Sequence, residues 1–489
     1  MSFSQNLDWF LTSNDDLLSP LLTEICLDID KTRVSNRRIN NDIRTKEKQA
    51  CNAIINALYQ GYFSIPKTWI SIPLRRSAYT NKEISYRSIK KIFDYLKKNK
   101  FIRVKLGSEY ARKYTRIFPI KKLQTKFKSL GFKWRHYHYD DNHKSIILRD
   151  ENKVDQNIPR NSTTEKYRTN LNKINKFLLR HCVALNLEDG SLEVIANLKL
   201  KELKDKHKEE EFKYSLNYSK VYLSRIFSRN SLELGGRFYR GWWQSLPKKF
   251  RPHITIDGYK TSEVDFSTMS LRILYAKENI KIPDNRDLYD IGLRGSKSYL
   301  TESRELVKEY INAALNDFKG NYRLNNKQLT TLKLSHNQLK DRVYQFHKPI
   351  SKYFSTGVGL ETMFIDSQIA MEIMLHYLED DIVVLPIHDS FIINSDYTHD
   401  LGRTMVNKFN SVVGCNTKVK TTNPLSPINF IDNPKLFNIA KKVHNKLSIK
   451  EKGNVINNTL DLKYPRSLYE HYVFSWSRWS IKNDKNLLL

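Results

Sequence analysis

Two aspartates carry the clearest chemical signal in the sequence. Asp265 ends a β-rich run in TSEVDFS, and Asp389 lies between two apolar β-rich runs in DIVVLPIHDSFIIN. Carboxylates that each end a buried strand can meet if the two strands are neighbours in one sheet. Mg²⁺ binds through few carboxylates plus substrate phosphates, and a two-metal site drives in-line displacement at phosphorus. The pattern therefore predicts metal-dependent nucleotidyl transfer.

The flanking segments predict the elements that position these acids. MSLRILYAKEN is typical of a helix that leaves the first strand, and DSQIAMEIMLHYLED of an amphipathic helix that precedes the second acid. His388 and Asp389 are expected at the tip of a hairpin. Taken singly, Asp265 fits a strand-end cap, Asp389 a turn residue and His388 a core histidine. The chemical interpretation therefore depends on their combination.

Residues 235 to 395 resemble the polymerase module of the family A DNA polymerases. VDFSTMSLRILYA is similar to motif A, PIHDSF to motif C, and Arg304 with Lys308 to the R-x-x-x-K of motif B. GGRF and QSLP resemble the segments that precede motif A, and DLYDIG resembles a D-I-H or D-x-Y element. The HDSF form is closer to the single-subunit phage-type RNA polymerases. The motifs occur in the order that the family has, although Arg304 and Lys308 also fit a solvated helix pair.

The resemblance implies a role for each matched residue. Asp265 and Asp389 would be the catalytic residues and would ligate two Mg²⁺ ions, with Mn²⁺ as an alternative. The expected nucleotide-binding residues are Arg304, Lys308, Ser270 and Asn312. The expected primer and template contacts are Arg237, His388 and Arg272.

The sequence also departs from the family pattern. Ser270 stands where the family has a glutamate that blocks the ribose 2′-hydroxyl, so the space for that hydroxyl is open. Asn312 and Asn316 stand where the pattern has two aromatic residues that stack on bases. The choice between deoxynucleotides and ribonucleotides is therefore open at this stage.

Composition supports a polyanionic partner. The 489-residue chain has 83 Lys and Arg against 52 Asp and Glu, a formal charge of +31, which favours nucleic acid through neutralisation of phosphates. No long apolar run, signal peptide or lipidation signal predicts a membrane partner. The cysteines Cys26, Cys51, Cys182 and Cys415 are too scattered for a zinc module or a disulfide framework. We expect a cytoplasmic, nucleoid-associated protein.

The N-terminal region has its own pattern. A buried helix is predicted near residues 49–60, and SYRSIKKIFDYLKKNK places Ile89, Ile92, Phe93 and Leu96 on one stripe with basic residues opposite. A hairpin with a basic tip is expected from FIRVKLGSEYARKYTRIFPI. This order resembles a winged helix-turn-helix, in which a helix enters the DNA major groove. The alternative is an amphipathic helix with an ordinary solvated basic face.

These patterns predict an α+β fold: a right-hand polymerase palm with an antiparallel sheet, small helical fingers and a helical thumb, preceded by a winged-helix-like domain. The expected divisions are an N-terminal segment of unknown role (1–47), the winged-helix-like domain (48–120), a basic helical linker or thumb-like region (121–230), the palm and fingers (231–430), and an aromatic, basic C-terminal segment (431–489).

The expected function is a template-directed nucleotidyltransferase, a DNA polymerase or primase-polymerase of a phage, plasmid or other mobile element. Its partners would be primer-template or single-stranded DNA and nucleoside triphosphates. Two alternatives stay open: a single-subunit RNA polymerase, favoured by HDSF and Ser270, and a non-catalytic DNA-binding replication initiator.

Overall fold

A computed structural model describes residues 4–7, 11–13, 18–31, 41–64, 67–79, 85–107, 114–130, 137–139, 145–186, 220–283 and 286–422. Helices combine with sheets whose strand pairs are mostly antiparallel, in agreement with the expected mixture of helix and antiparallel sheet. The predicted aromatic segment 431–489 lies outside the described residues. Among the residues that are described, no helix combines the length and apolarity needed to cross a bilayer.

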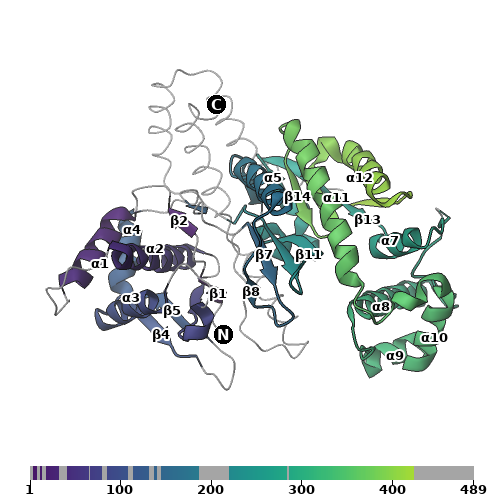
Figure 1. Ribbon diagram of the computed structural model, residues 1–489, viewed down its shortest axis with the longest axis horizontal. Helices are drawn as coiled ribbons and strands as arrows, with labels where there is room; N and C mark the ends of the chain where they lie inside the picture. The colour runs from purple at the N-terminus through teal and green to yellow at the C-terminus, as the bar shows by residue number, and fades with distance from the viewer. Residues whose placement is uncertain are drawn as a thin grey trace.

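The N-terminal elements lie together on the left of Figure 1. Their bounds are β1 Ser4–Asn6, β2 Leu11–Ser13, α1 Ser19–Lys31, α2 Asn41–Phe63, β3 Trp69–Ile72, the 3₁₀ turn η1 Arg76–Tyr79, α3 Tyr86–Lys98, β4 Ile102–Lys105, β5 Thr115–Pro119, α4 Lys121–Leu130 and β6 Tyr137–Tyr139. The expected buried helix, the stripe helix and the hairpin are thus confirmed as α2, α3 and β4–β5, and α2 is longer than predicted.

One core holds these N-terminal elements together. Four strands pair in the order β1-β3-β5-β4, and α1, α2 and α3 contribute buried side chains to the same cluster as this sheet. The predicted stripe of α3 faces that cluster, since Ile89, Ile92 and Leu96 are fully buried. Ser85 caps the helix by accepting a hydrogen bond from the Ser88 amide, which explains where α3 begins.

Residues 121–230, expected to form one basic helical region, divide between two cores. Leu123 and Phe127 of α4 are buried in the N-terminal cluster. By contrast, Leu171 and Leu185 belong to the large core of the following sheet. The periodicity of the segment predicts its helices but carries no information about which core each apolar stripe joins.

The second part of the chain begins with two sheets. Four strands pair in the order β11-β10-β7-β8, and a larger sheet has the order β14-β15-β13-β12-β9, with β16 pairing beside β13. The bounds are β7 Ile146–Arg149, β8 Asp155–Gln156, α5 Ser162–Leu178, β9 Val183–Leu185, β10 Ser224–Ser228, β11 Ser231–Tyr239, η2 Trp242–Ser245, η3 Lys248–His253, β12 Ile254–Ile256, β13 Tyr259–Phe266, β14 Val384–Ile387, β15 Ser390–Asn394, η5 Ser395–Tyr397 and β16 Val419–Thr422.

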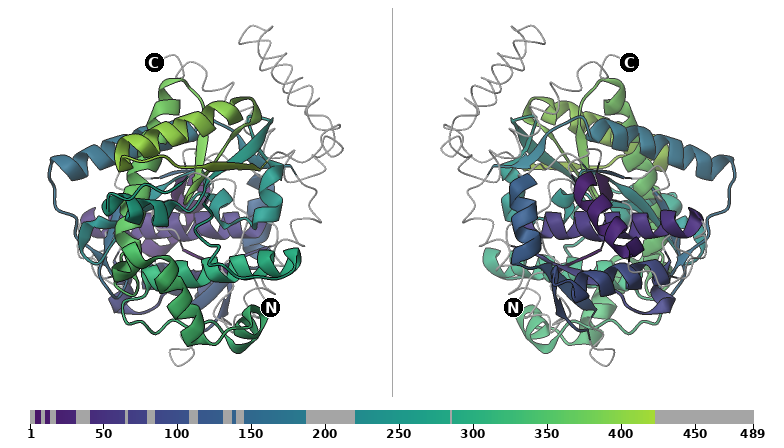
Figure 2. Two further views of the ribbon diagram at one scale, coloured as in Figure 1. Left: turned by 90° about the vertical axis from the view of Figure 1, so that its right-hand side faces the viewer. Right: turned by 90° about the vertical axis from the view of Figure 1, so that its left-hand side faces the viewer.

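Helices complete this part of the molecule. They are α7 Met269–Lys277, α8 Lys297–Asn316, α9 Asn326–Leu332, α10 His336–Phe346, η4 Lys348–Tyr353, α11 Gly359–Glu379 and α12 Thr398–Val413. Figure 1 shows the long α11 running from the strands toward the group formed by α8, α9 and α10, and Figure 2 shows α12 on the opposite side of the strands from that group. The helical group has its own core, separate from the core of the sheet.

His347, at the C-terminal end of α10, is a buried polar anchor of the helical group. Its Nε2 lies 3.0 Å from the Leu288 carbonyl, which can only accept, so Nε2 carries the proton and Nδ1 accepts from the Tyr275 hydroxyl at 3.0 Å. Burial lowers the pKa of His347 to about 4. The folded protein therefore holds a neutral imidazole.

This histidine predicts a pH dependence of stability. The unfolded chain takes up a proton at an ordinary pKa of 6.5, whereas the folded chain resists it down to about 4. Stability from the neutral imidazole is therefore complete above pH 6.5 and falls by about 3 kcal/mol as the pH drops to about 4. Chemical denaturation of wild type and His347→Gln should show a stability gap that narrows over this range. A gap that stays constant with pH would contradict the assignment.

Candidate active site

The sheet brings Asp265 and Asp389 together. Strand β13 pairs antiparallel with β15 so that Asp265 lies opposite Ser390, the residue after Asp389. The amide of Phe266, the residue after Asp265, donates to the Asp389 carbonyl at 3.0 Å. The two aspartates are therefore diagonal neighbours on adjacent strands. Both side chains are partly exposed. The predicted meeting of two strand-end carboxylates is therefore found in the structure.

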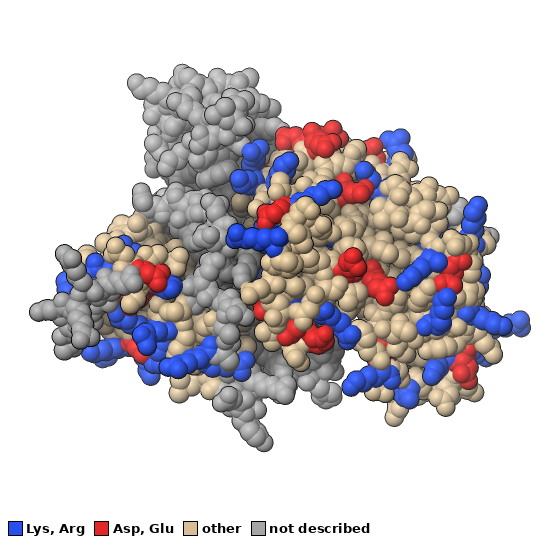
Figure 3. Space-filling view, viewed as in Figure 1, with Lys and Arg blue, Asp and Glu red and all other residues tan. Residues whose placement is uncertain are grey.

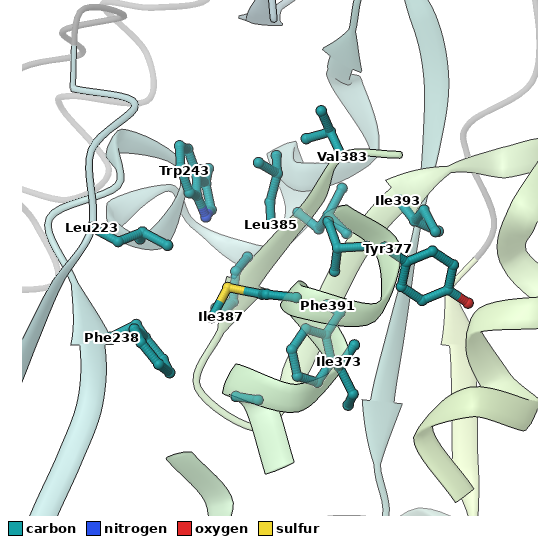
Figure 4. Close-up of a cluster of buried hydrophobic side chains, with 14 of the residues drawn as sticks. Leu223, Phe238, Trp243, Ile373, Tyr377, Val383, Leu385, Ile387, Phe391 and Ile393 are labelled. Atoms are coloured by element: carbon teal, nitrogen blue, oxygen red, sulfur yellow. The ribbon is translucent and has the colours of Figure 1, made fainter. Parts of the chain in front are cut away.

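Side chains of η2 hold the hairpin that carries Asp389 in place through hydrogen bonds. Two donors reach the Pro386 carbonyl in β14: the Trp243 indole at 3.1 Å and the Gln244 amide at 3.0 Å. Trp243 is fully buried beside Leu385, as Figure 4 shows. These contacts explain the QSLP segment, because its glutamine ties the hairpin to the strand that bears Arg237 through a second bond to the Phe238 carbonyl.

His388 occupies the turn itself. Its backbone φ of +56° lies in the left-handed region, which a non-glycine residue adopts rarely. The exposed imidazole makes an edge-to-face contact with Tyr239, with ring centroids 5.8 Å apart. The predicted primer-contacting histidine is therefore presented at the tip of the hairpin beside Asp389.

The electrostatics of the pair follow from this proximity. Burial and repulsion from Asp389 raise the pKa of Asp265 to about 7, although Lys248 and Lys308 act in the opposite direction. Two carboxylates that repel each other at a half-buried position form a local excess of negative charge. A divalent cation would relieve this repulsion, so the donor set fits Mg²⁺.

Helix α8 presents basic residues toward the acids. Lys308 is close enough to Asp265 for its positive charge to oppose the rise in the pKa of that carboxyl. The Lys308 ammonium lies 6.0 Å from the ring centre of Tyr289. Arg304 is one turn earlier and forms an ion pair with Asp287, with the Nε donor 2.5 Å from Oδ2. The predicted R-x-x-x-K residues therefore lie on the side of α8 that faces the candidate site.

Tyr289 is the tyrosine of the DLYDIG element, to which the sequence assigned no role in the site. It is buried between the guanidinium of Arg304, 5.2 Å from the ring centre, and Lys308. Burial and the charge of Asp389 raise the pKa of Tyr289, whereas the nearby side chain of Asn312 acts in the opposite direction. DLYDIG thus brings an aromatic ring to α8, whose own positions 312 and 316 are asparagines.

Ser270 and Arg272 have different positions on α7, the helix that follows Asp265. Ser270 is half-exposed near the start of the helix. Arg272, predicted to contact primer or template, is 2% exposed and donates to the Asn416 carbonyl at 3.3 Å. In this buried position Arg272 braces α7 against the segment before β16. Its expected contact with primer or template stays a prediction. Helical periodicity alone could not distinguish the two faces of this short helix.

Arg237 on β11 is anchored by a third carboxylate, Asp366. The Arg237 Nε donates to Asp366 Oδ2 at 2.5 Å, and the Asp366 side chain is only 3% exposed. Burial and the charge of Asp389 raise the pKa of Asp366 to about 7 despite the attraction of Arg237. Burial lowers the pKa of Arg237, but attraction to Asp366 and Asp389 has the larger effect, so the pKa of Arg237 is raised overall.

A buried network aligns the strand that carries Arg237. Gly236 has a φ of +72°, and a Cβ there would lie 2.8 Å from the Phe227 ring and 3.0 Å from the Ser367 hydroxyl, so glycine is required. The fully buried Arg225 donates to the Gly236 carbonyl at 2.8 Å and to the Ser367 hydroxyl at 2.7 Å. These bonds fix β11 against α11 beside the Arg237–Asp366 pair.

The described residues contain no group of three or more His, Cys, Asp or Glu side chains arranged to hold a metal ion. Two carboxylates suffice for Mg²⁺ when substrate phosphates and water supply the other oxygens.

No protein-family model matches the chain, and no curated protein matches it. Among solved structures, the chain is similar to the POL domain of Pol1 from M. smegmatis in complex with DNA primer-template and dNTP, with 12% identity and a TM-score of 0.28. The match covers 84% of this chain and 66% of that chain, just under two thirds. At this identity and TM-score, the likeness assigns neither a family nor a function to this chain.

Proposed function

We propose that this protein is a template-directed nucleotidyltransferase, a DNA polymerase or primase-polymerase of a mobile element, phage or plasmid. The observation that carries the proposal is the placement of Asp265 beside Asp389 across the β13–β15 pair. The repulsion that raises the pKa of Asp265 supports it, because a site that concentrates negative charge suits cations. The chain would act on DNA and therefore be nucleoid-associated.

Asp265 and Asp389 would hold two Mg²⁺ ions, or Mn²⁺ in their place. When bound, such ions activate a primer 3′-hydroxyl and stabilise the leaving pyrophosphate. Lys308 and Arg304 would bind the triphosphate. Arg304 would either keep its ion pair with Asp287 and use its remaining N–H donors, or leave Asp287 for the phosphate. Asn312 of α8 and Tyr289, which packs beside Arg304 and Lys308 of the same helix, would then line the nucleotide.

His388 and Arg237 would face the primer end. His388 is exposed at the tip of the hairpin, while the buried Asp366 orients Arg237. The Arg237 guanidinium retains further donors for a phosphate or a base edge, because a guanidinium has five N–H groups. In this arrangement residues of β11, β13 and the β14–β15 hairpin form a palm, and α8, α9 and α10 form small fingers.

The N-terminal unit would locate DNA as a winged helix. The chain order helix α2, strand β3, helix α3, hairpin β4–β5 and the sheet order β3-β5-β4 support this proposal. Arg87, Lys97 and Lys98 of α3 are exposed on the side away from the core, where duplex phosphates or base edges could be reached.

A single-subunit RNA polymerase is the second candidate, and Ser270 is the residue that favours it. Because serine leaves room for a ribose 2′-hydroxyl, wild type should incorporate ribonucleotides readily. We expect Ser270→Glu to raise the preference for dNTPs over NTPs by about tenfold or more. Ser270→Ala, which keeps the space open, should leave the preference unchanged. Equal selectivity of wild type and Ser270→Glu in competition assays would contradict this role.

One assay tests the proposed function. Purified protein is offered primed and unprimed templates with dNTPs or NTPs, in Mg²⁺, Mn²⁺ or EDTA. We expect template-dependent incorporation with either metal and none in EDTA. Absence of incorporation under every condition, together with intact DNA binding, would instead support a non-catalytic initiator.

A further inference from the structure

The N-terminal sheet has two faces of different chemistry. The inner face presents Ile70, Ile72 and Ile117, which are fully buried against α2 and its neighbours. Side chains alternate between faces along a strand, so the residues between these isoleucines point outward. The outer face therefore carries Trp69 from β3 and Phe118 from β5, and both rings are half-buried. Phe118 also packs against the edge of the core at Tyr62 of α2, with ring centroids 6.5 Å apart, and Ser71 on the same face is buried.

The two outward rings are neighbours across the strand pair. Ile70 pairs with Ile117, which places Trp69 beside Phe118, and the ring centroids are 5.4 Å apart at 32°. On the other side of Phe118, the directly opposed residue is Arg103 of β4. The next row across the sheet contains Arg116 opposite Lys105. Two rings are thus bordered by three cationic side chains on one face.

The charged residues of the described strands on this face are all basic. Strands β3, β4 and β5 contain no acidic residue, and Arg103 and Lys105 are exposed. The Lys105 ammonium lies over the Trp69 ring, 4.5 Å from the ring centre, in a cation–π contact. Figure 3 shows Lys and Arg gathered over the lower left of the molecule, the region of α3 and β4 in Figure 1.

We propose that this outer sheet face binds single-stranded DNA. Adjacent rings on a sheet offer stacking surfaces for unpaired bases, and the bordering cations neutralise the phosphates between them. Lys105 would leave the Trp69 ring for a phosphate when a base stacks there. Duplex DNA hides the faces of its bases, so it cannot use the rings. The choice of DNA over RNA rests on the proposed function. The inference that unpaired bases stack on this face rests only on the rings and cations described above.

This surface is distinct from the winged-helix contact. Helix α2 covers the inner face of the sheet, and α3 packs on α2 and the same core. A duplex held by α3 and a single strand on the outer face could therefore be bound by different surfaces of one unit. Such an arrangement would hold an opened template strand next to the duplex from which it came.

The test compares full-length wild type with Trp69→Leu/Phe118→Leu, which keeps apolar volume but removes the ring faces. Tyr397→Leu is the matched control, because this ring is 39% exposed on η5, away from the N-terminal sheet. Fluorescence anisotropy in EDTA measures binding of labelled oligo(dT), oligo(rU) and duplex DNA of about 12 nucleotides per strand. We expect about tenfold weaker oligo(dT) binding in the double variant, unchanged duplex binding, and no change in the control. Trp69→Phe, which keeps a ring, should bind like wild type.

Photo-crosslinking with 5-iodouracil oligonucleotides locates the strand, and the expected crosslinks fall at Trp69 or Phe118. Crosslinks confined to residues 220–422, or unchanged oligo(dT) affinity in the double variant, would overturn the proposal. A loss of thermal stability with unchanged affinity would show that the rings pack against protein instead. A preference for oligo(rU) that depends on Trp69 would contradict the choice of DNA. None of these readouts requires catalysis, so a failure here is separate from a failure of the proposed function.

Discussion

Replacing Asp265 or Asp389 with asparagine is expected to reduce nucleotide incorporation by about 1,000-fold or more, equivalent to roughly 4 kcal/mol in the barrier. Asparagine keeps the size of each side chain and removes the charge that would hold Mg²⁺. Because burial and Asp389 already raise the pKa of Asp265, the neutral residue relieves repulsion in the folded state. Thermal stability of Asp265→Asn should therefore equal or exceed that of wild type. Single-turnover primer extension and a melting curve measure the two effects.

A matched control for this pair is Asp396→Asn. Asp396 is an exposed carboxylate in η5, immediately after the β15 strand of the same hairpin, and it contacts no part of the candidate site. Its substitution should leave incorporation unchanged. If Asp265→Asn and Asp389→Asn retained wild-type incorporation while Asp396→Asn did the same, the two-carboxylate site would be excluded as the catalytic centre.

Arg237→Met is expected to have the second largest effect. The substitution leaves Asp366 buried without its cation, and breaking a buried pair in this way costs about 3 to 5 kcal/mol of stability. Incorporation should also fall by about 100-fold, because the primer end would lose its positioning group. Chemical denaturation measures the first effect, and kcat with saturating primer-template measures the second.

The double variant Arg237→Met/Asp366→Leu separates the structural role from the functional one. Two apolar side chains can replace a buried ion pair with little loss of stability, so much of the lost stability should return. Activity should stay low, since no guanidinium remains. The double-mutant cycle should therefore show strong coupling in stability. Recovery of full activity along with stability would mean that Arg237 only supports the fold.

Several parts of the structure could be predicted from local sequence. Asp265 and Asp389 each end an apolar run with the period of a strand, and these runs are β13 and the β14–β15 hairpin. The stripe of α3 and the hairpin that follows it also have local signatures, which the structure confirms. In these segments, periodicity and turn residues act over a few positions, so a single sequence contains the needed information.

Other features depend on contacts between distant segments. Asp366 lies in an apolar helix, where a buried carboxylate is unusual, but its partner Arg237 is 129 residues away and spacing does not connect them. Tyr289 meets α8 only through the path of the loop before that helix. Arg272 matches the arginine of motif A, yet its side chain is buried against Asn416. This contact forms because β16, which follows Asn416, pairs with β13. Tertiary packing determines these positions.

The most direct test of the central claim is the location of Mn²⁺ in a crystal of the full-length protein with primer-template and a non-hydrolysable nucleotide. Anomalous diffraction identifies the metal independently of activity. We predict peaks bound by the carboxylates of both Asp265 and Asp389 and by the triphosphate. Manganese bound elsewhere, or a nucleotide bound away from these two aspartates, would contradict the account.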